Sequence, residues 1–136
     1  MSGQLPEIDV AAGVLRDSQG RVLIAQRPAG SHQEGWWEFP GGKLSLDETP
    51  ADALRRELAE ELGIAVNRAE ALITYAHVYP ERKVNLHVSL VLDYDGQPAG
   101  AEGQALRWVR VEKLLEVGLL PADEPIVDAL LALTDG

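Results

Sequence analysis

The chain has 136 residues, no cysteine and a formal net charge of −10 at pH 7, and 46% of its residues are hydrophobic. This length and apolar content suffice for one ordinary core, so we expect a single domain over residues 1–136. The lack of cysteine excludes disulfides, thiolate catalysis and cysteine-bound zinc. The negative charge disfavours duplex nucleic acid and anionic membranes as partners, because both reward a basic patch.

The amino terminus, MSGQLPEIDV, lacks the basic start and the apolar run of a secretion signal. No segment approaches the apolar length that a membrane span needs. We therefore expect a soluble cytoplasmic protein that binds neither nucleic acid nor membrane. We also expect it to be a monomer.

The first third of the chain predicts two strands. Ile8 to Leu15 and Val22 to Gln26 are apolar runs on either side of a turn at Asp17 to Gly20, which favours a hairpin. Gly41 and Gly42 then lead toward a helix.

The helix is predicted to begin at Pro50 and to end before Gly63. Thr49 is a good N-cap, Pro50 suits the first helical position, and Asp52 is an acidic partner three residues after the cap. Gly63 provides the stop, because glycine readily adopts the left-handed conformation that ends many helices.

The rest of the chain predicts strands, a helical turn and a final helix. The expected strands are Leu72 to Tyr79, Val84 to Tyr94 and Arg107 to Val111. The helical turn is expected at Glu112 to Glu116, and a helix at Pro125 to Leu133. Pro80 to Lys83 reads as a turn, and Asp95 to Gly103 as a loop. Together these elements imply an α/β fold in which a mixed sheet lies between helices.

Carboxylates cluster on one face of the predicted first helix. The apolar stripe consists of Leu54, Leu58 and Leu62. The neighbouring stripe consists of Glu57, Glu60 and Glu61. Three carboxylates within about one turn repel each other, and a bound cation would relieve that repulsion.

A hard divalent ion is the obvious cation for this face. Mg²⁺ takes oxygen ligands and often combines a few carboxylates with phosphate oxygens and water. Arg56 can reach Glu60 at i+4 and could orient the ligands, whereas Glu48 precedes the helix in a loop. The alternative is a solvated acidic face with no ligand.

The same residues occupy the fixed positions of a known motif. Residues 42–64, GKLSLDETPADALRRELAEELGI, match GX5EX7REUXEEXGU, in which U is apolar. This motif is the Nudix box, so the chain resembles the Nudix hydrolases and the fold is expected to be the Nudix fold. The fixed positions are Gly42, Glu48, Arg56, Glu57, Leu58, Glu60, Glu61, Gly63 and Ile64.

Outside the box, the chain resembles the MutT-type branch, which hydrolyses 8-oxo-dGTP and thereby cleanses the nucleotide pool. The matching segments are AQRPAGSHQEGWWEFPGGK, YPERK, EGQALRW and LPADEPI. The resemblance implies that water attacks the β-phosphorus of a nucleoside triphosphate and gives the monophosphate and pyrophosphate. It also implies Mg²⁺ as the cofactor, with Mn²⁺ as a possible substitute.

The resemblance further implies a set of metal-binding and catalytic residues. The metal ligands would be the Gly41 carbonyl and the carboxylates of Glu57, Glu60, Glu61 and Glu102. Glu57 or Glu102 would orient or deprotonate the attacking water, and the sequence does not decide between them. Arg56, Glu57, Glu60 and Glu102 form the catalytic set. For Glu102 the alternative is a solvated carboxylate in a glycine-rich loop.

Residues that match nucleotide-binding positions lie before the box. They are Arg27, His32, Glu38, Phe39, Pro40 and Gly41. Arginine suits phosphate because its guanidinium can donate two parallel hydrogen bonds. The alternatives are a surface charge for Arg27 and a solvated loop residue for His32.

Aromatic and basic residues near these positions have weaker assignments. Trp36, Trp37 and Tyr79 are candidates for stacking on a base, with core packing as the alternative. Arg82 and Lys83 are expected to be solvated at the tip of a hairpin.

Asp123 departs from the best-known MutT pattern, which has asparagine there to read the base. An ionised aspartate only accepts hydrogen bonds, whereas an asparagine amide also donates. Asp123 could accept from guanine, donate to O6 if it is protonated in a dry pocket, or accept from the amine of cytosine. Related enzymes that hydrolyse CTP or 5-methyl-dCTP also resemble this chain. Asp123 could also cap the final helix.

Two classes of function remain as alternatives to an enzyme. Some Nudix-like domains sense nucleotides and have lost hydrolysis, but such domains commonly carry a broken box, and this box is intact. The other alternative is a structural or interaction domain with an acidic surface, which would bind neither Mg²⁺ nor nucleotide.

Overall fold

Two sheets form the centre of the computed structural model, which describes residues 5–134. The first is a four-stranded mixed sheet in the order β4-β1-β6-β5, and the second is a three-stranded antiparallel sheet in the order β3-β2-β7. The first sheet consists of β1 (Glu7–Leu15), β4 (Gly41–Lys43), β5 (Ala65–Val78) and β6 (Lys83–Asp95). The second consists of β2 (Arg21–Gln26), β3 (Trp37–Glu38) and β7 (Leu106–Arg110).

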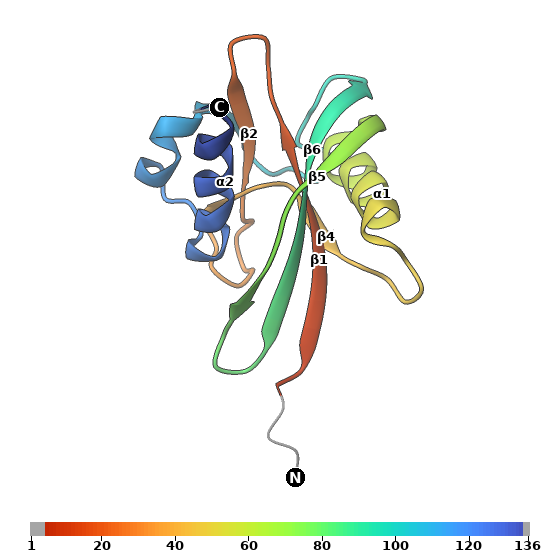
Figure 1. Ribbon diagram of the computed structural model, residues 1–136, viewed down its shortest axis with the longest axis vertical. Helices are drawn as coiled ribbons and strands as arrows, with labels where there is room; N and C mark the ends of the chain where they lie inside the picture. Colours follow the sequence, from red (N-terminus) through yellow and green to blue (C-terminus); the bar gives the residue numbers. More distant parts are fainter. Residues whose placement is uncertain (1–4, 135–136) are drawn as a thin grey trace.

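Helices cover the sheets on opposite sides (Figure 1). Helix α1 (Pro50–Leu62) lies on one side, and α2 (Glu124–Thr134) lies on the other with the short helices η1 (Val111–Glu116) and η2 (Pro121–Asp123). The expected α/β fold is therefore confirmed, with its strands divided between two sheets. Within residues 5–134, no helix is long and apolar enough to cross a membrane.

The turn predicted between the first two strands is present, but the prediction that these strands pair as a hairpin is wrong. The Asp17 carboxylate accepts from the Gln19 and Arg21 N–H groups, and Arg16 bridges Val22, but the strands then diverge. Strand β1 pairs with β4 and, in parallel, with β6, whereas β2 pairs with β3 and β7. Both strands are buried over consecutive residues and so are covered on both faces, and such apolar runs fit a hairpin and two separate sheets equally well.

Other differences from the predicted elements occur in exposed or very short segments. Strand β5 begins at Ala65, not at Leu72, because its first half is an irregular, mostly exposed edge with register shifts. Strands β3 and β4 have only two and three residues, and β4 contains two glycines. Neither is therefore long enough to show the alternation of apolar and polar residues by which a strand is predicted. The helical turn and the last helix lie where the sequence predicts them.

Helix α1 is held at both ends as its sequence predicts. The Thr49 hydroxyl accepts from the Asp52 N–H at 3.1 Å, and Pro50 occupies the first turn. Gly63 has a φ of 70°, and its N–H donates to the Ala59 carbonyl.

Gly13 lets α1 approach the four-stranded sheet closely. A Cβ at this position would lie 3.0 Å from a methyl carbon of Leu54 and 3.0 Å from one of Leu58. Both leucines are buried in the core beneath α1. A larger residue at position 13 would therefore push the helix, with its glutamates, away from β1.

We expect Gly13→Val to lower the free energy of unfolding by about 1 to 3 kcal/mol, because overpacking forces the leucines from their positions. Urea unfolding followed by circular dichroism measures this. Ala76→Val, at an exposed position of β5, is the matched control and should stay near wild type. Equal stability of the two variants would contradict the close packing.

Candidate active site

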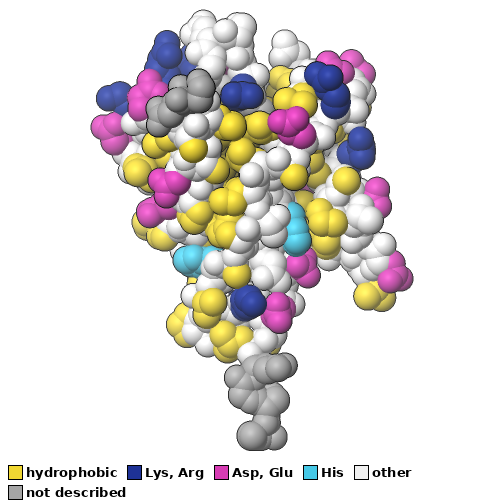
Figure 2. Space-filling view, viewed as in Figure 1, with side chains coloured by type: hydrophobic (Ala, Val, Ile, Leu, Met, Phe, Trp, Pro, Cys, Tyr) yellow, Lys and Arg dark blue, Asp and Glu magenta, His cyan; other side chains and the backbone are white. Residues whose placement is uncertain are grey.

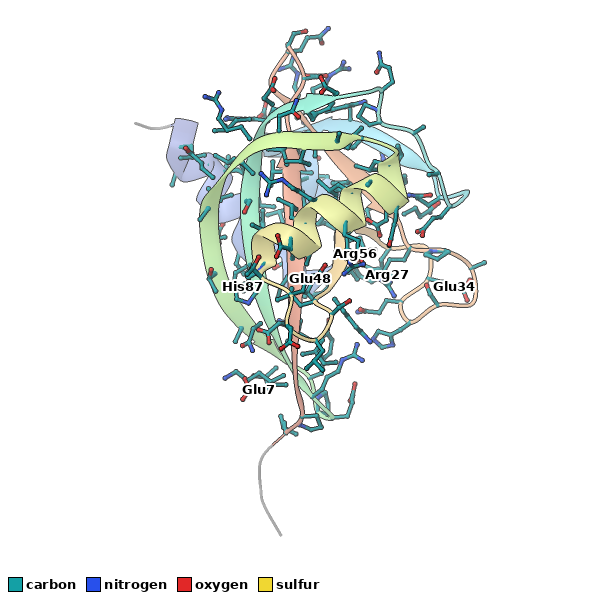
Figure 3. All side chains as sticks on the ribbon, turned by 90° about the vertical axis from the view of Figure 1, so that its right-hand side faces the viewer. Glu7, Arg27, Glu34, Glu48, Arg56 and His87 are labelled. Carbon is teal, nitrogen blue, oxygen red and sulfur yellow. The ribbon has the colours of Figure 1, made fainter. Side chains whose placement is uncertain are left out.

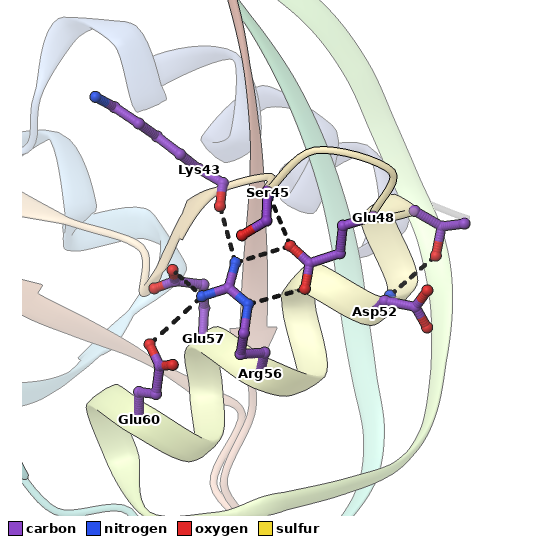
Figure 4. Close-up of polar contacts among 8 residues, drawn as sticks. Lys43, Ser45, Glu48, Asp52, Arg56, Glu57 and Glu60 are labelled. Atoms are coloured by element: carbon purple, nitrogen blue, oxygen red, sulfur yellow. Dashed lines mark hydrogen bonds and ion pairs between the residues drawn. The ribbon is translucent and has the colours of Figure 1, made fainter.

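Arg56, in the middle of α1, is the centre of a network of carboxylates (Figure 4). Its guanidinium makes two 2.8 Å hydrogen bonds to Glu48 and one of 2.8 Å to Glu57. It also donates to the Lys43 carbonyl at 3.0 Å and to Glu60 at 3.4 Å. The contact from Arg56 to Glu60 that the sequence predicts is present, and Glu48 is the main partner of Arg56.

Glu48 fixes Arg56 from the loop before the helix. The Arg56 guanidinium and the Ser45 N–H, which donates to Glu48 at 2.8 Å, lower the pKa of this carboxyl to about 2. The pKa of Arg56 is raised by hydrogen bonds to Glu48 and Glu57. Both groups therefore stay charged over the whole physiological pH range.

Two glycines bring the backbone of β4 against the carboxylates of α1. A Cβ at Gly42 would overlap the Glu57 carboxyl group, and one at Gly41 would overlap the Ala11 carbonyl of β1. The Gly41 N–H donates to the Glu61 carboxylate at 2.9 Å. Only glycine leaves room for the glutamates at this point.

Glu61 is a carboxylate whose charged form is disfavoured by its surroundings. Burial raises its pKa to about 8, the Gly41 N–H opposes this shift, and the nearby carboxylates of Glu57, Glu38 and Glu102 raise it further. Four carboxylates thus lie within electrostatic reach of one another. A bound cation would stabilise their charged forms.

Glu102 reaches this cluster from a loop far along the chain. It lines a small cavity of about 50 Å³ together with Glu38, Glu61 and Pro40. The Ala101 N–H next to it donates to the Glu61 carbonyl at 3.0 Å, which anchors the loop on the last turn of α1.

The donor set suits a hard divalent ion. It consists of carboxylate oxygens and backbone carbonyls, with no sulfur or imidazole, which is the chemistry that Mg²⁺ prefers. In the present side-chain conformations, no group of three or more acidic, histidine or cysteine side chains in residues 5–134 surrounds a single point. Glu57 and Glu60 turn toward Arg56 instead, and Glu61 turns toward the Gly41 N–H.

A larger cavity of about 380 Å³ opens beside the carboxylates. Its wall includes most of the residues predicted to bind substrate, which are Arg27, His32, Glu38, Phe39, Gly41 and Asp123. Pro40 and Glu102 line the small cavity, and Glu38 and Glu61 line both. Acidic, basic and apolar side chains are interspersed over the face shown in Figure 2.

Arg27 closes the base of the loop that carries His32. Its guanidinium makes two 3.2 Å contacts to the Glu38 carboxylate and donates to the His32 carbonyl at 2.7 Å. The Arg27 N–H also bonds to the Trp36 carbonyl. Figure 3 shows this loop, marked by Glu34, projecting from the body of the molecule.

Asp123 is the buried carboxylate of the large cavity, with 6% of its surface exposed. One oxygen accepts from the Phe39 N–H at 2.9 Å, so the side chain ties η2 to β3 and does not cap α2. Burial raises the pKa of Asp123 to about 7, the Phe39 N–H lowers it, Glu38 raises it and Arg27 lowers it. The pKa values of Tyr75 and Tyr79 are also raised by burial and by Asp123.

Two basic residues of the large cavity, Arg82 and Lys43, were not assigned this position from the sequence. Arg82 and Tyr79 both line it, with the Arg82 guanidinium 5.4 Å from the centre of the Tyr79 ring and the Arg82 Nε buried without a partner among residues 5–134. The expectation that Arg82 is merely solvated is therefore wrong. A two-residue turn at Pro80 and Glu81 puts Tyr79 opposite Arg82, which is the signal that could have paired them.

Lys43 is the second such residue, and it follows the two glycines of β4. The two tryptophans behave differently. Trp37 packs against the core and Trp36 is partly exposed, and neither lines the large cavity, whereas Tyr79 does.

The geometry has counterparts in known proteins. The family model described as NUDIX domain matches residues 11–129. The chain is 42% identical over 126 residues to the CTP pyrophosphohydrolase of Escherichia coli (strain K12), which covers 93% of each chain. It is 46% identical over 97 residues to the 8-oxo-dGTP diphosphatase of Proteus vulgaris, which covers 71% of this chain and 87% of the relative.

Solved structures share the fold. The solution structure of the E. coli ORF135 protein matches with a TM-score of 0.85 at 40% identity, covering 98% of this chain and 95% of that one. The two relatives are thus named for two different substrates, CTP and 8-oxo-dGTP.

The burial of Asp123 makes the stability of the fold depend on pH. Its folded-state pKa of about 7 lies above the usual 3.8, so the unfolded chain loses this proton first as the pH rises. Stability therefore falls between pH 4 and pH 7.

We expect Asp123→Asn to remove this dependence while it still accepts from the Phe39 N–H. One pKa unit corresponds to about 1.4 kcal/mol, so the variant should gain up to about 4 kcal/mol on wild type between pH 4 and pH 8. Urea unfolding at a series of pH values tests this. A difference that does not change with pH would show that Asp123 does not titrate in this range.

Proposed function

Because this chain belongs to the Nudix family, we propose that it is a divalent-metal-dependent nucleoside triphosphate pyrophosphohydrolase whose preferred substrate is 8-oxo-dGTP. Nudix hydrolases generally use divalent metal ions such as Mg²⁺ and act on small nucleotides. We propose Mg²⁺ for this chain, with Mn²⁺ as a substitute, and a monomer as the active form.

The observation that carries this proposal is that the Arg56 network adjoins the large cavity, because Lys43, whose carbonyl accepts from Arg56, lines that cavity. Arg56 holds Glu57 and Glu60 on α1, and Glu61 lines the cavity that also contains Arg27, Lys43 and Asp123. Carboxylates for a cation thus adjoin cationic side chains suited to phosphates and a buried group suited to a base. A solvated acidic helix face would not need these neighbours.

The proposed reaction is hydrolysis at the β-phosphorus. Water attacks this atom, its bond to the oxygen shared with the α-phosphate breaks, and the products are the nucleoside monophosphate and pyrophosphate. The Gly41 carbonyl and the carboxylates of Glu57, Glu60, Glu61 and Glu102 would hold the metal. When bound, the metal neutralises charge on the phosphate oxygens and lowers the pKa of water.

The chain's own side chains would position the reactants. Glu57, held by Arg56, or Glu102, on its anchored loop, orients the attacking water and accepts its proton. Arg27 and Lys43 on the cavity wall can donate to phosphate oxygens, and the Tyr79 ring can pack on the base.

Protonated Asp123 could read an oxidised guanine as asparagine would. One of its oxygens accepts from the Phe39 N–H, so the other can carry the proton and donate to O6. The raised pKa of about 7 supports a neutral carboxyl at and below neutral pH. Glu38 disfavours the charged form, and Arg27 favours it.

A cytosine nucleotide is the second candidate substrate. In its ionised form Asp123 only accepts, and the exocyclic amine of cytosine is a suitable donor. The relative named CTP pyrophosphohydrolase supports this candidate.

We expect Glu57→Gln to lower kcat by about 100-fold or more while the fold remains intact, because the amide can neither accept the proton nor carry the charge. Pyrophosphate release in Mg²⁺ measures kcat, and circular dichroism checks the fold. Glu112→Gln, at an exposed position of η1, is the control and should retain wild-type turnover. Wild-type kcat in the Glu57 variant would refute its role.

The two substrates predict opposite pH profiles. We expect kcat/KM for 8-oxo-dGTP to exceed that for dGTP, CTP, 5-methyl-dCTP and ADP-ribose, and to fall as the pH rises through about 7, because Asp123 loses its proton. Asp123→Asn should keep turnover of 8-oxo-dGTP and lose this step in the profile. A preference for CTP or 5-methyl-dCTP that increases through the same range would favour the second candidate.

A further inference from the structure

The last carbonyls of α1 are bound by the loop that carries Glu102. A helix leaves its final carbonyls without partners inside the helix, and another segment must supply donors. Here the Ala99 N–H donates to the Leu62 carbonyl at 3.0 Å, and the Ala101 N–H donates to the Glu61 carbonyl at 3.0 Å. The end of α1 is therefore the base on which this loop rests.

The side chain of Gln104 adds a second connection to the same point. Its Nε2 donates to the Glu61 carbonyl at 2.9 Å, and its Oε1 accepts from the Glu102 N–H at 3.0 Å. One amide group thus joins the backbone of Glu61 to the backbone of Glu102. These two residues also line the small cavity, together with Gln104 itself.

The loop around Glu102 has little freedom apart from this connection. The Gly103 N–H donates to the Gly100 carbonyl at 2.9 Å, and a Cβ at Gly100 would overlap the Gln104 carbonyl. The Gln26 N–H binds the Ala105 carbonyl at 3.0 Å, which fixes the far end of the loop to β2. Glu102 lies at an exposed position between these contacts. Its N–H group donates to the side chain of Gln104.

We propose that Gln104 is a positioning residue that sets the distance between the Glu102 carboxylate and the carboxylates of α1. This inference rests on the proposed function of Glu102. Gln104 touches neither substrate nor the reacting atoms in this scheme, and acts through the backbone of Glu102.

An amide is required at position 104 because the two contacts need one donor and one acceptor. Glutamate would keep the acceptor for the Glu102 N–H but lose the donor to Glu61, and it would add a negative charge beside other carboxylates. Methionine has a similar length and makes neither bond. The two substitutions thus separate loss of one contact from loss of both.

The first test is steady-state pyrophosphate release with Mg²⁺ for wild type, Gln104→Met, Gln104→Glu and Gln97→Met. We expect both Gln104 variants to lose about 10- to 100-fold in kcat, as is usual for residues that support metal ligands, with KM within about twofold of wild type. Gln97 is exposed on the same loop and makes no side-chain hydrogen bond within residues 5–134, so its variant should match wild type. Wild-type kcat in Gln104→Met would overturn the proposal.

A double-mutant cycle asks whether Gln104 acts through Glu102. In a Glu102→Gln background, Gln104→Met should change kcat by less than about twofold, because the group that it positions is already gone. A full further loss in that background would show that Gln104 acts elsewhere, and would overturn the proposal.

Amide hydrogen exchange gives a readout that does not depend on turnover. In Gln104→Met the Glu102 N–H should exchange at least about tenfold faster, while the Ala99 N–H, which binds Leu62, stays as in wild type. If wild type releases no pyrophosphate, the proposed function fails, and the exchange data still decide on Gln104. Unchanged exchange at Glu102 would overturn the positioning role in either case.

Discussion

The interaction on which the site depends is the one between the Arg56 guanidinium and the carboxylates around it. Glu48 takes two of its donors and holds it across the start of α1, so that Glu57 and Glu60 face a fixed positive charge. Without that charge, the glutamates of one helix turn would repel one another and spread into solvent. The glycines of β4 matter for the same reason, because any side chain at Gly42 would displace the Glu57 carboxyl.

The remaining parts of the site are held to this helix by backbone contacts. The Gly41 N–H of β4 donates to the Glu61 carboxylate, and N–H groups of the loop that carries Glu102 donate to the last carbonyls of α1. Phe39 and Asp123, which are joined by a hydrogen bond from the Phe39 N–H to the Asp123 carboxylate, both line the large cavity. The proposed catalytic carboxylates and the proposed base-binding residue thus belong to two networks, one joining α1 to β4 and one joining η2 to Phe39.

The sequence predicted the parts of this architecture that have a local signal. Caps at Thr49 and Gly63 gave the bounds of α1, and the spacing of its glutamates gave the carboxylate face. It could not show that β1 and β2 enter different sheets, because their apolar runs fit either arrangement. Nor could it place Arg82 in the cavity or join Gln104 to Glu61, since these contacts depend on hairpin geometry and on residues 43 positions apart.

The central claim, that this helix supports attack of water on the β-phosphorus, is tested most directly by hydrolysis in water enriched in ¹⁸O. The account predicts that one labelled oxygen appears in pyrophosphate and none in the nucleoside monophosphate, for whichever nucleotide is the best substrate. Label in the monophosphate would mean attack at the α-phosphorus and would contradict the proposed reaction. Release of inorganic phosphate without pyrophosphate would contradict it as well.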